Sequence, residues 1–299
     1  MDSRAVVFQA VAMKQPKRLK VAMLGFGEAG ATFAASGLFA DRTAAFDSGI
    51  PASELKKRMH ACRVTHCRSN ANATEHADVV LSLVTADQAL NAATQTASNI
   101  RHNALYLEMN SVAPMTKHEA ADAMFAAGAQ CLDVAIMAPV NPAKMGVPLL
   151  VSGQTAEWGQ TVLESLGFTN VRVVGTEIGQ AAAIKMIRSV IVKGMEALTA
   201  EAVLAGHRAG VLDHVLTSLA PEWKDQADYR LDRMLVHGVR RAAEMEEVAK
   251  TLKALSVAPL MTEGTIARQR ALGALGLGDV PVSMSEKIKA ILDNAGRYV

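Results

Sequence analysis

Short apolar runs alternate with longer mixed segments through the first part of the chain. The runs are rich in Val, Leu, Ile and Ala, and they occupy residues 19–24, 43–47, 62–67, 76–85, 104–110, 129–137, 147–153 and 170–175. Several of the segments between them have the spacing of apolar positions that is typical of helices, namely 31–38, 48–60, 86–97 and 114–128. Strands that alternate with helices predict a doubly wound, mostly parallel α/β sheet.

The pattern changes after residue 175. Residues 177–210 form one long helical pattern without proline, and its apolar positions go most of the way round the helix. We therefore expect this helix to be largely buried. Further helical patterns lie at 211–220, 222–254 and 259–273. The sequence predicts three parts, which are an N-terminal extension at 1–18, an α/β domain at 19–176 and an all-helical domain at 177–299.

Composition narrows the classes of function. Half of the 299 residues are hydrophobic, a fifth are charged, and the net charge is +2. This balance is typical of a globular protein and gives no basis for a nucleic-acid or anionic-membrane partner. No apolar stretch approaches the roughly 18 residues that would predict a membrane span. The three cysteines favour a reducing, cytoplasmic setting. The cluster His60, Cys62, His66 and Cys67 lacks the usual ligand spacing, so we expect no metal.

Glycines at 25, 27 and 30 follow the first apolar run and precede a helical pattern. This is the G-x-G-x-x-G spacing in the strand–turn–helix context of a Rossmann dinucleotide-binding domain. The glycines allow a tight turn, a close approach of pyrophosphate to the backbone, and close packing of helix on strand. Glu28 should point away from the phosphates. We expect the cofactor to lie along Gly25, Phe26, Gly27, Glu28, Ala29 and Gly30.

Asp47 ends the second predicted strand. A carboxylate there can accept hydrogen bonds from the ribose hydroxyls of the adenosine and would repel a 2′-phosphate. The sequence thus favours NAD over NADP. The alternative is that Asp47 is a turn or N-cap residue.

Ligands of open α/β sheets collect at the carboxyl ends of the strands. Three such ends carry candidate ligand contacts: Thr85 and Ala86 for the nicotinamide, then Asn110 and Ser111, and Met137, Ala138 and Pro139 for the substrate. Asn110 and Ser111 would alternatively cap the helix that starts near Pro114.

Lys185 lies near the start of the long apolar helix, with Ser189 one turn further on the same face. A lysine on a helix is usually solvated. In this apolar setting it is also a candidate general acid–base.

Four ordered segments resemble the β-hydroxyacid dehydrogenases, the family that contains 3-hydroxyisobutyrate and 6-phosphogluconate dehydrogenases. They are "GFGEAG" (25–30), "EMNSVAP" (108–114), "LDVAIMAPVNPAKMG" (132–146) and "GQAAAIKMIRS" (179–189). The resemblance implies a Rossmann domain followed by a helical domain, with Lys185 as the catalytic lysine. The chain departs from the family at Met137–Ala138–Pro139, where Ser-Gly-Gly is usual, and at Arg188 and Ser189, where an Asn pair is usual. It thus resembles a less-characterised branch.

His237, Arg240 and Arg241 lie on or near one helical face in "RMLVHGVRRAAEMEEVAKTL". They would bind a substrate carboxylate or another anion, with His237 and Arg241 as the residues to test. The alternative is that Arg240 and Arg241 belong to an exposed face paired with Glu244, which is four and three residues further on.

The sequence therefore predicts an NAD-dependent oxidoreductase acting on a 3-hydroxy acid or hydroxy-amino acid, with Lys185 as general acid–base. The long apolar helix predicts a homodimer or larger homo-oligomer through residues 177–299. Two alternatives are an imine or keto reductase of the same fold, which usually lacks the lysine, and a dinucleotide-binding protein without turnover.

Overall fold

The computed structural model describes residues 19–294, so the predicted extension at 1–18 lies outside the described residues. Contacts divide the described chain into two units. The first contains residues 19–110 and 120–177, and the second contains 111–119 and 178–294. The sequence places the change of character at 176 and gives no sign that 111–119 group with the helical part.

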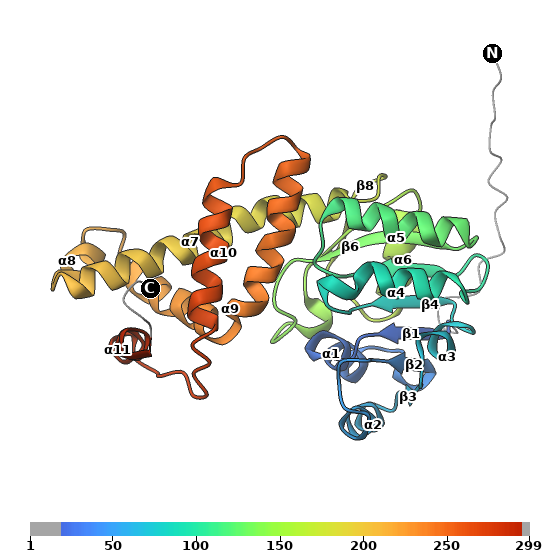
Figure 1. Cartoon of the computed structure of the whole chain (residues 1–299). Helices are drawn as coiled ribbons and strands as arrows, with labels where there is room; N and C mark the ends of the chain where they lie inside the picture. Colours follow the sequence, from blue (N-terminus) through green and yellow to red (C-terminus); the bar gives the residue numbers. More distant parts are fainter. Residues whose placement is uncertain (1–18, 295–299) are drawn as a thin grey trace, which may run out of the picture. The chain divides into compact units, whose positions relative to one another are not determined.

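The first unit is built on an eight-stranded sheet in the order β3-β2-β1-β4-β5-β6-β7-β8 (Figure 1). All neighbouring strands are parallel except β6 and β7, which are antiparallel. The strands are β1 (Val21–Leu24), β2 (Thr43–Phe46), β3 (Thr65–His66), β4 (Val79–Ser82), β5 (Leu105–Glu108), β6 (Gln130–Ile136), β7 (Leu149–Ser152) and β8 (Val171–Gly175). This sheet confirms the predicted mostly parallel α/β fold.

Helices connect the strands. They are α1 (Glu28–Ser36), α2 (Ala52–Ala61), α3 (Asn70–Thr74), α4 (Ala89–Ala97), α5 (Pro114–Ala126) and α6 (Ala156–Ser165), with single turns η2 (Ala40–Arg42), η3 (Ala86–Gln88) and η4 (Lys144–Gly146). Every residue of β1, β4, β5 and β7 is buried, as expected for strands covered on both faces. Phe33 of α1 meets Phe168 edge-on in the core, with ring centroids 5.0 Å apart. The chain order reverses at β1, so the switch point where ligands bind in such sheets lies between β1 and β4.

The second unit is helical. It contains α7 (Gln180–Arg208), α8 (Leu212–Thr217), α9 (Trp223–Ala254), α10 (Leu260–Gly273) and α11 (Met284–Asn294), together with the first residues of α5. Helices α9 and α10 approach closely at Gly238, where a Cβ would lie 2.2 Å from the Gln269 carbonyl oxygen. Across the described residues, none of the helices combines the length and apolar character that a bilayer crossing requires.

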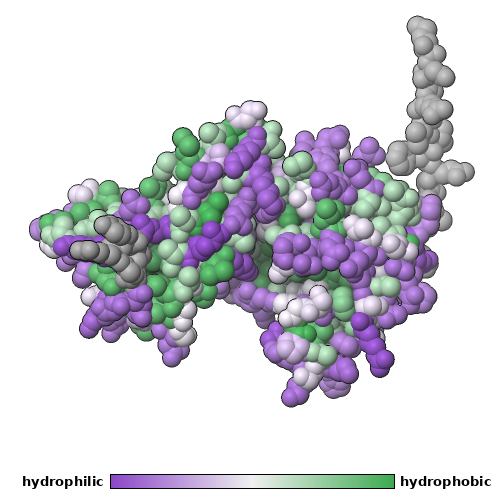
Figure 2. Space-filling model, viewed as in Figure 1, coloured by the Kyte–Doolittle hydropathy of each residue, from purple (hydrophilic) through white to green (hydrophobic). Residues whose placement is uncertain are grey.

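The prediction that the long helix is largely buried is wrong for one face of α7. Ile191 is 69% exposed and Leu198 is 52% exposed, and Ile184 and Ile187 are exposed as well. Spacings of three, four and seven residues place these four side chains along one stripe. Hydrophobic surface is visible over the part of the molecule that contains α7 and α8 (Figure 2).

Candidate active site

The loop from β1 to α1 adopts the geometry that the glycine motif predicts. Gly25 has a φ of +90°, which L side chains rarely adopt, and a Cβ there would lie 2.4 Å from the Leu83 carbonyl oxygen. A Cβ at Gly30 would lie 2.4 Å from the Gly25 carbonyl oxygen. The turn therefore requires glycine at the first of these positions, and the packing of α1 requires it at the second.

Gly27 is different, because its own packing does not require a glycine. Its φ is −68°, and a Cβ built on it meets no atom within 4 Å. Gly27 immediately precedes α1, whose first N–H groups lack partners in the helix and whose positive dipole end attracts anions. The open space at Gly27 and these N–H groups fit the pyrophosphate of a dinucleotide.

Glu28 is exposed at the first position of α1, where its Oε1 accepts a hydrogen bond from Asn141 Nδ2 at 3.4 Å. Asn141 follows the Met137–Val140 segment that leaves β6.

Asp47 lies directly after β2 and supports the glycine loop. Its Oδ2 accepts the Phe26 N–H at 2.6 Å, and its Oδ1 accepts the Gly49 N–H at 2.7 Å. The carboxylate thus has the turn-forming role that the sequence left open. Each oxygen retains a second lone pair, so the ribose contact stays a prediction.

The other predicted contacts of the cofactor and substrate lie after β4 and β6. Thr85 is exposed and precedes η3, where hydrogen bonds from Gln88 and Thr85 lower the pKa of Asp87. Met137 is half-buried and its N–H donates to the Pro148 carbonyl at 2.9 Å, whereas Ala138 and Pro139 are exposed.

Asn110 follows β5 and is held by buried polar side chains. Its Nδ2 donates to Ser82 Oγ at 3.0 Å and to Glu108 Oε1, and its backbone N–H also donates to Glu108 Oε1, at 3.3 Å. Ser82 and Glu108 are register partners on β4 and β5, and both are buried. Burial and the Glu108 carboxylate raise the pKa of nearby Tyr106 well above its ordinary value. The end of β5 therefore carries a cluster of hydrogen-bonded polar side chains that is largely shielded from water.

Lys185 lies in the first turns of α7 and is half-buried. Its Nζ donates to Ser111 Oγ at 2.6 Å. The Ala113 N–H, just before α5, donates to Glu247 Oε2 at 2.9 Å. Helices α7 and α9 thus hold residues 111–113. The Glu247 carboxylate therefore accepts a backbone N–H at the start of α5, while the Asn110 and Ser111 side chains have other hydrogen-bond partners.

Arg241 does not fit its predicted role as a clamp for a substrate carboxylate. It is 7% exposed, and its Nε donates to Glu196 Oε2 at 3.1 Å while its Nη2 pairs with Glu196 Oε1. Gln269 Nε2 donates to the same Oε2 at 2.7 Å. The Arg241 guanidinium therefore already forms a bidentate ion pair with a carboxylate of the same chain.

Two further residues that the sequence predicts to contact the substrate are Ser189 of α7 and His237 of α9. Ser189 is buried and its Oγ donates to the Lys185 carbonyl at 2.9 Å, as helical serines often do. His237 is half-buried in α9, and its substrate contact stays a prediction.

A second buried ion pair lies close to Arg241. Lys193 Nζ is 2.6 Å from Glu244 Oε2. Burial opposes ionisation of Glu244, but the Lys193 and Lys185 cations outweigh it and lower the pKa to about 2. On the lysine, burial wins and lowers the pKa of Lys193 even though Glu244 favours its charged form. Attraction between the two groups is therefore largely offset by the cost of burying the ammonium.

Sequence reasoning missed the buried acids that hold these groups, Glu108, Glu196 and Glu247. A signal was present, because Glu108 interrupts the apolar run at 104–110 and Glu196 lies within the apolar helix. A charged residue in such a run must be paired if it is buried.

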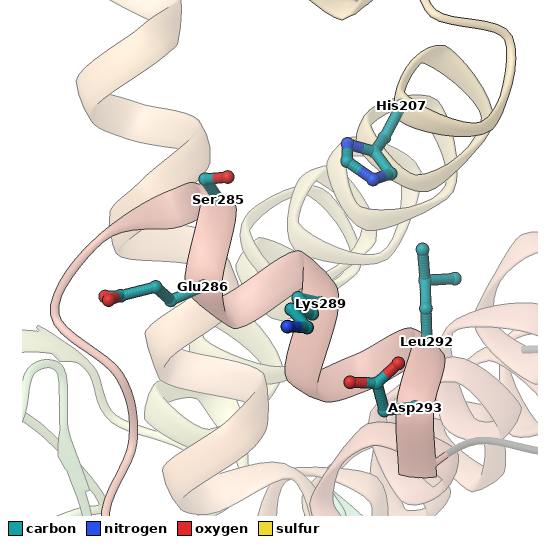
Figure 3. A pocket seen from close by; sticks show the side chains of 6 residues that line it. All are labelled: His207, Ser285, Glu286, Lys289, Leu292 and Asp293. Carbon is teal, nitrogen blue, oxygen red and sulfur yellow. The ribbon is translucent and has the colours of Figure 1, made fainter.

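A hollow of about 300 Å³ in the helical unit is lined by none of these residues (Figure 3). His207 of α7 and Ser285, Glu286, Lys289, Leu292 and Asp293 of α11 line it. It does not bring together any of the predicted site residues.

Comparisons with known proteins agree with this architecture. Residues 20–175 match the model of the NAD binding domain of 6-phosphogluconate dehydrogenase, and residues 206–272 match a domain of unknown function. The resemblance to that family is confirmed.

Two solved structures above 25% identity are similar over most of the chain. A conserved hypothetical protein from Sinorhizobium meliloti 1021 is 34% identical, covers 92% of this chain and 96% of its own, and has a TM-score of 0.71. A conserved protein of unknown function, described as structurally similar to 3-hydroxyacid dehydrogenases, is 28% identical, with 93% and 100% covered and a TM-score of 0.67.

More distant structures show the fold alone. The 3-hydroxyisobutyrate dehydrogenase of Mycobacterium tuberculosis, solved with L-serine, is 18% identical, with 86% and 94% covered and a TM-score of 0.71. Two structures that are each 17% identical share the fold. One is a complex with NADP⁺, with 85% of this chain and 94% of its own covered and a TM-score of 0.65. The other is an imine reductase variant of Myxococcus stipitatus with NAD⁺, with 92% and 99% covered and a TM-score of 0.56. The fold thus does not distinguish NAD from NADP.

Proposed function

The chain belongs to the family that carries the NAD-binding domain of 6-phosphogluconate dehydrogenase, and within it we propose a dehydrogenase of 3-hydroxy acids or hydroxy-amino acids. The observation that carries the proposal is the hydrogen bond from Lys185 Nζ to Ser111 Oγ, 2.6 Å long. It joins the candidate acid–base to a hydroxyl that is next in sequence to Asn110, at the end of β5. A lysine, a hydroxyl and an amide are suitable groups for a substrate that carries both a carbinol and a polar substituent.

Lys185 is the group that moves the proton. When bound, the nicotinamide supplies the hydride acceptor for oxidation or the hydride donor for reduction. Lys185 Nζ takes the carbinol proton in the oxidative direction and returns it in the reductive direction. Ser111 Oγ orients the ammonium or amine, and the segment from Met137 to Asn141 borders the substrate. The apolar Met137 suits a bulkier or less polar substituent than a Ser-Gly-Gly loop accepts.

We propose NAD as the preferred dinucleotide. Asp47 lies at the end of β2, where a 2′-phosphate would meet a carboxylate. Titrating the wild-type protein with NADH and NADPH tests the preference by fluorescence. NADPH binding as tight as NADH binding would contradict it.

The principal experiment is a screen of 3-hydroxy acids and hydroxy-amino acids with NAD and NADP, followed at the nicotinamide absorbance. The variant Lys185→Met should abolish turnover and leave NADH binding within about threefold, since a general acid–base contributes about 10²–10⁴-fold to the rate. Lys253→Met is the matched control, because that lysine is 63% exposed on α9. It should leave both turnover and NADH binding unchanged.

Three results would argue against parts of this proposal. Turnover that survives in Lys185→Met would exclude this lysine as the acid–base. Reduction of cyclic imines with no oxidation of any hydroxy acid would favour the imine reductase alternative. NADH binding without turnover of any substrate in either panel would favour a binding protein without catalysis.

We also propose that a second copy of the chain covers the exposed apolar stripe of α7. Four large aliphatic side chains along one face, Ile184, Ile187, Ile191 and Leu198, are unusual on a surface that meets only water. Light scattering should show a dimer or larger oligomer for the wild type. The double variant Ile191→Glu/Leu198→Glu should be monomeric, and a wild-type monomer at micromolar concentration would refute the proposal.

A further inference from the structure

The amide of Asn110 is fixed in one orientation by its neighbours. The side chain is 5% exposed. Its Nδ2 donates both of its hydrogens, one to Ser82 Oγ at 3.0 Å and the other to Glu108 Oε1. A carboxyl oxygen that already receives the Asn110 backbone N–H can only accept. The nitrogen of the amide must therefore face Glu108, and the carbonyl oxygen must face away from it.

That carbonyl oxygen is the part of Asn110 left for a ligand. Among the residues that the structure describes, Asn110 Oδ1 has no hydrogen-bond partner although it is buried. A buried acceptor without a donor costs roughly 1–3 kcal/mol, so such a group in a native protein calls for an explanation, and a ligand that supplies the donor is one. The oxygen can accept but cannot donate. It would attract an N–H group and repel a carboxylate.

We infer that Asn110 Oδ1 selects a ligand that presents an N–H donor, and that Glu108 and Ser82 are positioning residues that keep this oxygen available. The inference rests on the proposed function, because Asn110 lies beside Ser111 and the carbinol hydroxyl is already assigned to Lys185. Two ligand groups have the required chemistry. One is the ammonium of a hydroxy-amino acid, and the other is the carboxamide of the nicotinamide.

Two matched pairs of ligands separate these sources. L-Serine and 3-hydroxypropanoate differ only in the amino group, and kcat/KM is measured for both. NAD and its 3-acetylpyridine analogue differ only in the carboxamide NH₂, and their dissociation constants are measured by calorimetry without any turnover. The proteins are the wild type, Asn110→Ala and Glu108→Gln. Ser152→Ala is the control, since Ser152 is another buried polar residue of the sheet, on β7.

In one of the two pairs, the wild type should prefer the N–H ligand by about 5- to 100-fold, as one buried hydrogen bond allows. Asn110→Ala should reduce this ratio to within about twofold. Glu108→Gln should lower it while leaving Asn110 in place, because a neutral glutamine oxygen holds the Asn110 amide nitrogen less strongly than the carboxylate does. Ser152→Ala should not change it. A purely structural role of Glu108 would lower stability without altering the ratio.

The inference is overturned if the wild type discriminates within neither pair, or if the discrimination persists in Asn110→Ala. Failure of the proposed function looks different. No substrate would then be turned over, yet the calorimetric pair would still show whether Asn110 recognises the carboxamide. If Asn110→Ala does not fold, the ratio in Glu108→Gln decides, and an unchanged ratio counts against the inference.

Discussion

Replacing Arg241 distinguishes a structural role from a substrate-binding role. The variant Arg241→Met keeps much of the side-chain volume and removes the charge. Glu196 is then left buried on α7 without its arginine, and it keeps the hydrogen bond from Gln269 Nε2, 2.7 Å long. We expect the variant to be markedly less stable than the wild type, because one partner of a buried ion pair is then missing.

The size of the effect follows from the burial of both partners. The Arg241 and Glu196 side chains are 9% and 5% exposed, and breaking such a pair from one side costs about 3–5 kcal/mol. The remaining bond from Gln269 puts the loss near the lower value, about 3 kcal/mol. For a helical unit of this size the melting temperature should fall by about 10 °C. Removing both partners, in Arg241→Met/Glu196→Met, should restore most of the loss.

Urea unfolding followed by circular dichroism measures the stability of these variants, and KM is measured on whichever acid is turned over. Arg240→Met is the matched control, since Arg240 is the preceding residue, is 58% exposed and lies 3.8 Å from Glu244. It should change stability by less than about 0.5 kcal/mol. If Arg241→Met melts like the wild type and raises KM at least tenfold, Arg241 binds substrate and the interpretation of the Glu196 pair is wrong.

Three other substitutions test separate parts of the molecule. Gly27→Ala should leave the melting temperature unchanged, because a Cβ meets nothing within 4 Å, and should weaken NADH binding at least tenfold in a fluorescence titration; equal affinity would exclude a pyrophosphate at Gly27. The pKa of Glu244 is about 2 in the folded protein against 4.5 unfolded, so its ionisation contributes stability that is complete above pH 4.5 and is lost as the pH falls toward 2. Urea unfolding of wild type and Glu244→Gln should therefore show a difference that narrows over that interval; a constant difference would contradict the low pKa. Glu247→Ala should lower kcat at least fivefold with NADH binding unchanged, because it frees the Ala113 N–H beside Ser111; unchanged kcat would show that Ser111 needs no such support.

The strands could be predicted from the sequence because buried parallel strands are continuous apolar runs. All eight lie within predicted runs, although β3 is only Thr65–His66. Helices α3, α6 and α11 were not predicted, although α6 and α11 are slightly longer than the predicted helices α1 and α4. Their positions depend on distant partners. A Cβ at Gly159 of α6 would lie 2.0 Å from the Leu132 side chain, and Ile288 and Ile291 of α11 join the core of the helical unit.

The exposed stripe of α7 shows another limit of prediction from the sequence. A hydrophobic position in a sequence indicates that a side chain avoids water, but it does not indicate whether its own chain or a second copy covers it. Ile191 and Leu198 follow the helical period as closely as the buried Val203 does. Only the fold of the single chain separates the two groups.

The candidate site shows why residue types were easier to predict than their roles. Glycines 25, 27 and 30 and Lys185 are identified by local spacing. The role of Arg241 depends on Glu196, which is 45 positions away in the sequence, so no local pattern could exclude a substrate carboxylate. Buried acidic side chains likewise hold the polar residues that are proposed to contact the substrate. Glu108 orients Asn110, and Glu247 holds the segment that contains Ser111. A carboxylate in an apolar run must have a strong partner if it is buried. The partners of acidic residues within apolar runs should therefore be identified first, because these partners are the polar groups that are no longer available to a substrate.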